Sequence, residues 1–282
     1  MTLFEHQNPL GLVSATSLPR YHPHNFRDAM ISVYNMWNVL DHLTLQNHIS
    51  LQPWAFGHFL PVQAEKLVRL VRRKKVHTYC EVGFNGGHSA VAVLASTMNV
   101  TVISFDSAEY GQHTQQNADW VSRIWPGRFR FVLGDSRETL QSFANMVSNA
   151  RELSCDVILV DGSHNEQPVL MDLRHFCKSA SKNAPLILDD LDSPAGLSVL
   201  HAVSHKWVEM TAWYIYHVTD RIPPFPCKGC VRQLPNLTSI HDPERRLLPC
   251  IRWVNDGCKQ SWDPLKCRRC DDAAAWGIAR CV

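Results

Sequence analysis

The sequence predicts an α/β protein built on a doubly wound, mostly parallel sheet. Between residues 76 and 205, apolar runs of strand length alternate with segments of helical periodicity. Five of these runs end in a carboxylate, and the first also opens into a glycine-bearing turn. Ligands bind at the carboxyl ends of the strands in such sheets, so we expect the site there.

Composition narrows the function classes. The chain has 282 residues, 45% of them hydrophobic, and a net charge of +2, so it can bury a full core and carries no strongly basic field. We therefore expect no nucleic-acid or membrane partner. A secretory leader and a run of about 18 apolar residues are both lacking, which predicts a soluble, cytoplasmic protein.

The chain divides into three expected parts. Residues 1–60 form an N-terminal arm and cap helices, 61–222 the ligand-binding core, and 223–282 a cysteine-rich segment that ends in a closing strand. Apolar residues at helical spacing predict helices over 26–40 and 61–73, the second with Pro61 at its first position.

The strands follow in order along the core. Apolar and β-branched runs predict five central strands, a sixth within 207–220 and a closing seventh, which makes a seven-stranded sheet. The predicted central and closing strands cover 76–81, 100–105, 128–133, 156–160, 184–188 and 276–282.

The residues after the first strand predict a nucleoside-binding turn. Gly83, Gly86 and Gly87 permit a tight turn, and the helix that starts at His88 offers backbone N–H groups to a ligand. Glu81 disfavours a pyrophosphate there and suits the amino group or sulfonium of S-adenosylmethionine. Asp106, about twenty residues on, is placed to bind ribose hydroxyls. The turn lacks the GxGxxG order of dinucleotide sites, which favours S-adenosylmethionine over NAD.

Five segments together resemble class I S-adenosylmethionine-dependent methyltransferases. Within that class, the chain is similar to metal-dependent O-methyltransferases of the catechol and macrolide-sugar types. The resemblance covers about residues 60–205 and implies a Rossmann-like methyltransferase sheet. The segments are Glu81-Val-Gly-Phe-Asn-Gly-Gly-His-Ser-Ala90, Val102-Ile-Ser-Phe-Asp106, Val132-Leu-Gly-Asp-Ser136, Asp156-Val-Ile-Leu-Val-Asp161 and Leu186-Ile-Leu-Asp-Asp190.

The resemblance also implies residue roles. Residues for the methyl donor are Glu81, Gly83, Phe84, Asn85, Gly87, Ser89, Asp106, Asp135, Ser136 and Asp161. Asp161, Asp189 and Asp190 match the ligands of a divalent metal such as Mg²⁺, and His164 matches the catalytic base. The third ligand is asparagine in the catechol enzymes, so Asp190 favours the sugar type.

The chemistry of methyl transfer fits these residue types. An alcohol or phenol is largely protonated at neutral pH, whereas the reaction needs an electron-rich oxygen. A hard divalent ion on carboxylates can lower the pKa of that hydroxyl, and an imidazole can accept its proton. Two alternatives stay open: His164 as a surface loop residue, and Asp189 and Asp190 as helix caps without metal, with Asp192 as a further cap or substitute ligand.

Seven of the 10 cysteines lie after residue 226. Two pairs have the C-x-x-C spacing of zinc knuckles, which predicts a structural Zn²⁺ on Cys227, Cys230, Cys267 and Cys270. A disulfide framework and free thiols are the alternatives. The odd count of seven and the missing leader argue against disulfides.

These patterns predict an O-methyltransferase that uses S-adenosylmethionine and a divalent metal to methylate a hydroxyl of a small molecule, with His164 as base. One alternative is a metal-independent methyltransferase acting on nitrogen or a protein side chain. Another is an inactive, zinc-stapled interaction protein. The sequence does not identify the acceptor molecule or the oligomeric state, and a homo-oligomer is one possibility.

Overall fold

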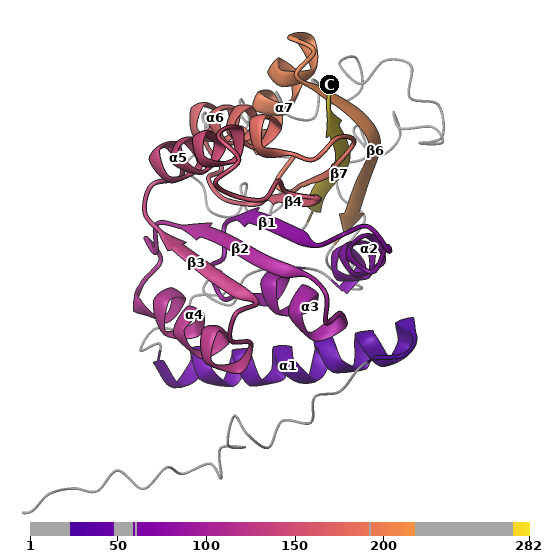
Figure 1. The fold of residues 1–282 in the computed structure, drawn as a ribbon, viewed down its shortest axis with the longest axis vertical. Coiled ribbons are helices and arrows are strands. Elements are labelled where there is room, and N and C mark those ends of the chain that lie inside the picture. Colours follow the sequence, from indigo (N-terminus) through magenta and orange to yellow (C-terminus); the bar gives the residue numbers. More distant parts are fainter. Residues whose placement is uncertain (1–22, 48–58, 60, 192, 218–272) are drawn as a thin grey trace, which may run out of the picture.

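The computed structural model describes residues 23–47, 59, 61–191, 193–217 and 273–282 (Figure 1). The four cysteines expected to bind zinc lie outside these residues: Cys227, Cys230, Cys267 and Cys270. Asp192 also lies outside them. In the described part of the chain, no helix is both long and apolar enough to cross a membrane.

A single seven-stranded sheet organises the described residues, in the order β3-β2-β1-β4-β5-β7-β6. The strands are β1 (Thr78–Val82), β2 (Thr101–Asp106), β3 (Phe129–Leu133), β4 (Val157–Val160), β5 (Pro185–Leu188), β6 (Val208–His217) and β7 (Ala273–Cys281). The first five are parallel, and β7 is antiparallel to both β5 and β6. The predicted fold class is confirmed.

The chain reverses its direction of winding between β1 and β4, which are neighbours in the sheet. Strands β2 and β3 lie on one side of this pair, and β5, β7 and β6 lie on the other. The connections after β1 and β4 therefore leave the sheet on opposite faces, which opens a crevice at the carboxyl ends of these two strands. This position is where the predicted site residues converge.

Helices cover both faces of the sheet (Figure 1). They are α1 (Phe26–Asn47), α2 (Pro61–Val71), α3 (His88–Ser96), α4 (Gln112–Ile124), α5 (Ser136–Ser148), α6 (Glu166–Ser179) and α7 (Ala195–Ser204). Helices α1 to α4 pack together below the sheet in Figure 1, with α1 along the outside, and α5 to α7 pack above it. The first helix runs seven residues beyond the predicted end at Leu40.

Alternating side chains of the strands divide the buried residues into two cores. In β1, Tyr79 belongs to the core shared with α1 to α4, and its neighbour Cys80 belongs to the core under α5 to α7. Successive residues of a strand point to opposite faces, so a strand covered on both sides is apolar throughout. This explains why the central runs show no alternation of polar and apolar residues.

Two disulfides lie within the described residues: Cys80–Cys155 and Cys177–Cys281. The second ties β7 to α6. It also changes the number of cysteines left to pair in the cysteine-rich segment, because Cys281 has its partner, Cys177, outside that segment. Six cysteines then remain between residues 227 and 270, and six is an even number. The odd count therefore no longer argues against disulfides there.

Candidate active site

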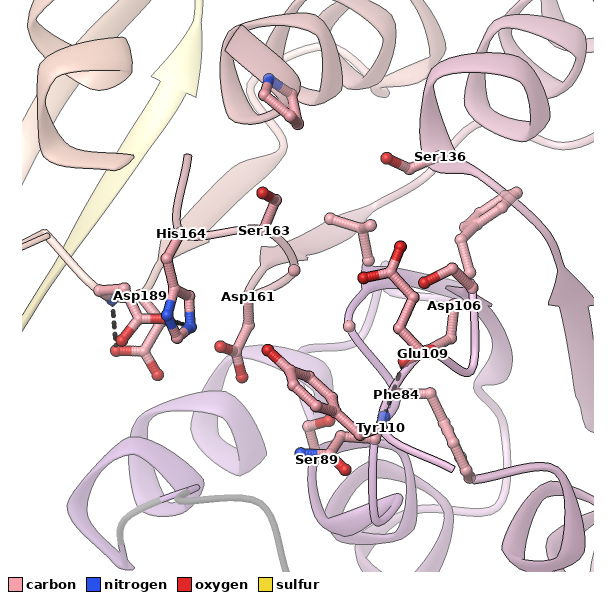
Figure 2. Close-up of a pocket in the computed structure, with 18 of the residues that line it drawn as sticks. Phe84, Ser89, Asp106, Glu109, Tyr110, Ser136, Asp161, Ser163, His164 and Asp189 are labelled. Carbon is pink, nitrogen blue, oxygen red and sulfur yellow. Dashed lines mark hydrogen bonds and ion pairs between the residues drawn. The ribbon is translucent and has the colours of Figure 1, made fainter. Parts of the chain in front are cut away.

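A cavity of about 570 Å³ opens at the carboxyl ends of the parallel strands. Figure 2 shows Asp106 and Phe84 at one side of it, His164 and Asp189 at the other, and Asp161 and Tyr110 between them. Most predicted site residues line this one cavity: Gly83, Phe84, Asn85, Ser89, Asp106, Asp135, Ser136, Asp161, His164, Asp189 and Asp190. Glu81 and Gly87 do not line it.

The turn between β1 and α3 depends on backbone conformations that favour glycine. Gly83 has a φ of +95°, and a Cβ atom there would lie 1.7 Å from the carbonyl oxygen of Asp161. Gly87 has a φ of +92°, and its Cβ would lie 2.6 Å from the ring of Phe84. Gly87 is thus needed for the turn to close over Phe84, whereas we expected it to contact the ligand.

The Asp106 carboxylate fixes the shape of this turn from the end of β2. One oxygen accepts a hydrogen bond from the backbone N–H of Asn85 at 2.8 Å, and the other accepts from the N–H of Ala108 at 2.6 Å. Asn117 of α4 donates to the carbonyl of Gly86 at 3.0 Å and to Thr44 of α1 at 2.9 Å. The turn is therefore held from several elements before any ligand binds.

Glu81 lies beneath the cavity floor and does not line the cavity. This position does not support the contact that we expected between Glu81 and the sulfonium or amino group of the donor. The side chain is fully buried and accepts hydrogen bonds from the Tyr79 and Ser104 hydroxyls, each at 2.6 Å. Burial raises the pKa of the Glu81 carboxyl to about 7, although these hydrogen bonds oppose the shift. Glu81 belongs to a β1 to β2 network below the turn.

The loop after β3 is held by its own residues. Asp135 caps α5 by accepting from the backbone N–H of Arg137 at 2.9 Å, and the Arg137 guanidinium also bonds to this carboxylate. The hydrogen bonds from Arg137 lower the pKa of the Asp135 carboxyl. Ser136, the first residue of α5, faces the cavity beside them.

The opposite end of the cavity concentrates negative charge. Asp161 follows β4, and Asp189 and Asp190 follow β5. Loss of solvent, followed by the charges of Asp189 and Asp190, raises the pKa of the Asp161 carboxyl well above its usual range. A proton or a cation bound at this end would relieve the repulsion.

His164 and Gln63 contact these carboxylates. The Nε2 atom of His164 lies 2.9 Å from a carboxylate oxygen of Asp190, which has a positive φ of 53°. Gln63 of α2 donates to Asp189 at 2.7 Å, and the second oxygen of Asp189 accepts from the N–H of Asp190 at 3.0 Å. His164 is thus oriented by a carboxylate, as a general base requires.

The three carboxylates fit a hard divalent cation in their chemistry, because Mg²⁺ and similar ions prefer carboxylate oxygens. Their positions favour other partners, since Asp190 pairs with His164 and Asp189 with Gln63. Among the residues that the model describes, no group of three or more His, Cys, Asp or Glu side chains is arranged to hold a metal ion. A bound ion would need some of these side chains to exchange partners.

Sequence reasoning missed several residues of the cavity wall: Phe59, Gln63, His88, Glu109, Tyr110 and Arg137. Arg137 and His88 directly follow predicted site residues, so their position in the motifs could have indicated them. Phe59 and Gln63 precede the first strand, and tertiary packing brings them here; α2, which carries Gln63, packs against α3 and α1. No local pattern could have indicated these two.

Comparison with known proteins identifies a methyltransferase domain in the central part of the chain. Residues 80–191, about two fifths of the chain, match the family model of a methyltransferase domain. These residues include both the glycine turn and the carboxylates after β4 and β5. A search of curated proteins gives no match.

Three solved structures are similar to this chain at low sequence identity. An O-methyltransferase from Bacillus cereus in complex with SAH is 15% identical, with 73% of this chain and 88% of that chain covered and a TM-score of 0.46. A precorrin 8w decarboxylase from Methanobacterium thermoautotrophicum is 13% identical (82% and 95% covered, TM-score 0.47). A precorrin-6y C5,15-methyltransferase from Geobacter metallireducens is 11% identical (58% and 82% covered, TM-score 0.43).

Proposed function

Since residues 80–191 form a methyltransferase domain on a class I sheet, we propose that the chain transfers a methyl group from S-adenosylmethionine to a hydroxyl oxygen of a small molecule. The observation that carries this proposal is the two-part cavity. It joins the glycine turn and Asp106 to the His164–Asp190 pair within one space of about 570 Å³. Donor and acceptor can therefore meet in it.

The donor occupies the side of the cavity formed by β1, β2 and β3. Asp106 binds the ribose hydroxyls, because its oxygens are already fixed by two backbone N–H groups and keep further lone pairs. Asp135 and Ser136 flank the adenine side. The methionine part lies along the turn of Gly83, Phe84, Asn85 and Ser89.

The acceptor hydroxyl lies at the carboxylate end, next to His164. His164 accepts the hydroxyl proton while the oxygen attacks the methyl carbon; the new C–O bond forms as the C–S bond breaks and S-adenosylhomocysteine leaves. Asp190 stabilises the imidazolium that results, since its carboxylate lies 2.9 Å from Nε2. Holding both reactants in one cavity supplies much of the remaining acceleration.

A divalent cation is part of this proposal, with Asp161, Asp189 and Asp190 as its ligands. When bound, such an ion lowers the pKa of an acceptor hydroxyl and orients it. The support is the charge at this end of the cavity, where burial and then the like charges of Asp189 and Asp190 raise the pKa of the Asp161 carboxyl. Vicinal hydroxyls on the acceptor would suit such an ion, because both oxygens can bind it.

The His164–Asp190 pair favours a second candidate, in which the same methyl transfer proceeds without metal. An Asp-oriented histidine can remove the hydroxyl proton by itself. In this version no cation balances Asp161, whose pKa is raised by burial and then by the charges of Asp189 and Asp190. The carboxylates after β5 then only orient His164 and Gln63.

Two measurements test the proposal in sequence. Calorimetric titration with S-adenosylhomocysteine should show binding, and a panel of catechols and sugar diols should include a substrate that gains one methyl group by mass. Absence of binding would contradict the proposed function as a whole. Once a substrate is identified, turnover is measured after chelation and again after addition of Mg²⁺. Turnover that is lost on chelation and restored by Mg²⁺ supports the metal-dependent mechanism. Turnover that chelation leaves unchanged supports the mechanism in which His164 acts without a metal.

A further inference from the structure

Every cysteine in the described part of the chain is paired, although the proposed mechanism uses no disulfide. Cys80 of β1 is bonded to Cys155, which lies two residues before β4, and Cys177 of α6 is bonded to Cys281 of β7. The partners are 75 and 104 positions apart, so folding has to bring four thiols into two specific pairs. The first pair is fully buried, whereas both cysteines of the second are partly exposed.

This pairing indicates an oxidising environment. Disulfides form and persist in secretory and extracellular compartments and are rare in the cytosol, where thiol reductants keep cysteines reduced. A partly exposed pair such as Cys177–Cys281 is accessible to thiol exchange, so it persists where free thiols are scarce. The covalent structure therefore favours a different compartment from the cytoplasm that the sequence analysis predicts.

The residues Asn99-Val-Thr101 have the Asn-x-Thr spacing of an acceptor for N-linked glycans. Asn99 lies in the turn between α3 and β2, and its side chain is exposed. Its backbone N–H donates to Oγ1 of Thr97 at 3.4 Å, but its side-chain amide has no hydrogen-bond partner among the described residues. A sugar attached to this amide would therefore displace no contact in that part of the chain.

Arg128 holds the turn that presents Asn99. Its guanidinium donates to the carbonyl oxygens of Leu94 at 3.3 Å, Thr97 at 2.6 Å and Val100 at 2.9 Å. The Val100 side chain is buried. These contacts fix the backbone on both sides of Asn99 without using its side chain, so the amide faces solvent from an ordered turn.

Asn99 lies at the end of the sheet opposite to the cavity. Strand β2 begins two residues later, at Thr101, and ends at Asp106, whose side chain lines the cavity. A strand rises about 3.3 Å per residue, which places Asn99 roughly 20 Å from Asp106. A glycan at Asn99 is thus compatible with an open cavity.

We propose that Asn99 is an N-glycosylation site of a chain that folds in an oxidising, secretory compartment. The amide nitrogen of Asn99 bonds to C1 of a sugar carried by a lipid-linked oligosaccharide. The C–O bond from C1 to the lipid diphosphate breaks, the diphosphate leaves, and the amide gives up one proton. The inference does not depend on methyl transfer, because neither Asn99 nor the four paired cysteines line the cavity.

Secretion of the full chain from cultured eukaryotic cells, directed by an added leader, tests the modification. N-glycans are removed by a glycosidase in heavy-oxygen water, which converts a glycosylated asparagine to labelled aspartate. Peptide mass spectrometry should find the label at position 99, separately from the second Asn-x-Thr sequence at Asn236, and should find both disulfide-linked peptide pairs.

A matched pair of variants at Thr101 isolates the acceptor sequence. Thr101→Ser keeps the hydroxyl that glycan transfer requires, and Thr101→Val removes it in a residue that also favours a strand. We expect the label at position 99 to remain in the first variant and to be lost in the second. Asn99→Gln should also lose the glycan and keep the melting temperature of the deglycosylated chain, because its amide has no described partner.

Expression of the same chain in the cytosol tests the compartment. Alkylation under denaturing conditions should find the thiols of Cys177 and Cys281 free. The melting temperature should be lower than that of the secreted, deglycosylated chain by at least about 10 °C, because native disulfides restrict the unfolded chain.

Other results would overturn the inference. An unlabelled Asn99 in a secreted chain that has both disulfides, or a label that persists in Thr101→Val, would contradict the glycosylation site. A cytosolic chain with free thiols and an unchanged melting temperature, or a chain that is not secreted at all, would contradict folding in an oxidising compartment. None of these results bears on the proposed function, which binding of S-adenosylhomocysteine tests separately.

Discussion

The two halves of the cavity differ in how their charges are balanced. At the donor half, both oxygens of Asp106 accept backbone N–H groups, and Asn117 holds the carbonyl of Gly86. At the acceptor half, three carboxylates lie near one another, and the pKa of Asp161 is raised by Asp189 and Asp190 after loss of solvent. The donor half is thus preorganised, whereas the acceptor half depends on a proton or a cation.

The difference shows how one sheet edge serves two purposes. A carboxylate whose two oxygens accept backbone N–H groups stabilises a fixed turn. A buried carboxylate beside two other acids, such as Asp161, keeps a repulsion that a bound proton or cation can relieve. Substitutions in the donor half should therefore change binding and shape. Substitutions in the acceptor half should change turnover.

The largest effect should come from Gly83→Ala, which tests whether the donor turn is rigid. The new Cβ would overlap the backbone of Asp161, and φ is +95°. We expect loss of measurable S-adenosylhomocysteine binding and a stability loss of at least about 3 kcal/mol in urea unfolding. Gly127→Ala is the control, since its φ is +75° but nothing lies within 4 Å; it should cost about 1 kcal/mol and leave binding unchanged. Normal binding by Gly83→Ala would contradict preorganisation.

His164→Ala should produce the next largest effect, confined to turnover. Removing a general base lowers kcat by about 10²- to 10⁴-fold, and the affinity for S-adenosylhomocysteine should stay the same because His164 contacts Asp190 rather than the donor turn. Steady-state kinetics on an identified acceptor measures the first value and calorimetry the second. An unchanged kcat would contradict the role of His164 as base. Weaker binding of S-adenosylhomocysteine would contradict the separation of donor binding from the acceptor half of the cavity.

Asp106→Asn should weaken donor binding more moderately. The amide nitrogen cannot accept the hydrogen bond from Asn85 or Ala108, so one backbone N–H loses its partner and the ribose loses a charged acceptor. We expect about 10- to 100-fold weaker S-adenosylhomocysteine binding by calorimetry. Asp119→Asn, on the exposed face of α4, is the matched control and should bind normally. Equal affinities for the two variants would argue against Asp106 as the ribose ligand.

The last prediction concerns Glu81, below the donor half, and changes stability rather than binding or turnover. Its pKa is raised from 4.5 to about 7 in the folded protein, so between these values the folded state holds a proton that the unfolded state has lost. Stability should therefore fall as pH rises through this window, by up to about 3 kcal/mol from this group. Glu81→Gln should flatten the urea-unfolding profile between pH 4.5 and 7.5. Asp172, also raised to about 7, adds a slope of the same sign that remains in the variant.

Much of the site was predictable because strand ends and turns are local features. The acids near the ends of β1 and β2, the acids after β4 and β5, and the glycines of the first turn are visible in the sequence. The parallel sheet brings most of them to one cavity. The metal ligands and the role of His164 remain predictions. The direction in which a side chain points was less predictable, as Glu81 shows.

The sequence by itself determined the order of strands and helices, the glycine turn and the row of acids, since each follows from periodicity or backbone freedom within a few residues. Only the tertiary structure decided which acids are balanced, because that depends on partners far along the chain. Asp41 reaches His88 across 47 positions, Gln63 reaches Asp189 across 126, and Cys177 reaches Cys281 across 104. Charges and hydrogen bonds join residues that are close in space, and no local sequence pattern shows which residues so far apart in the chain become neighbours.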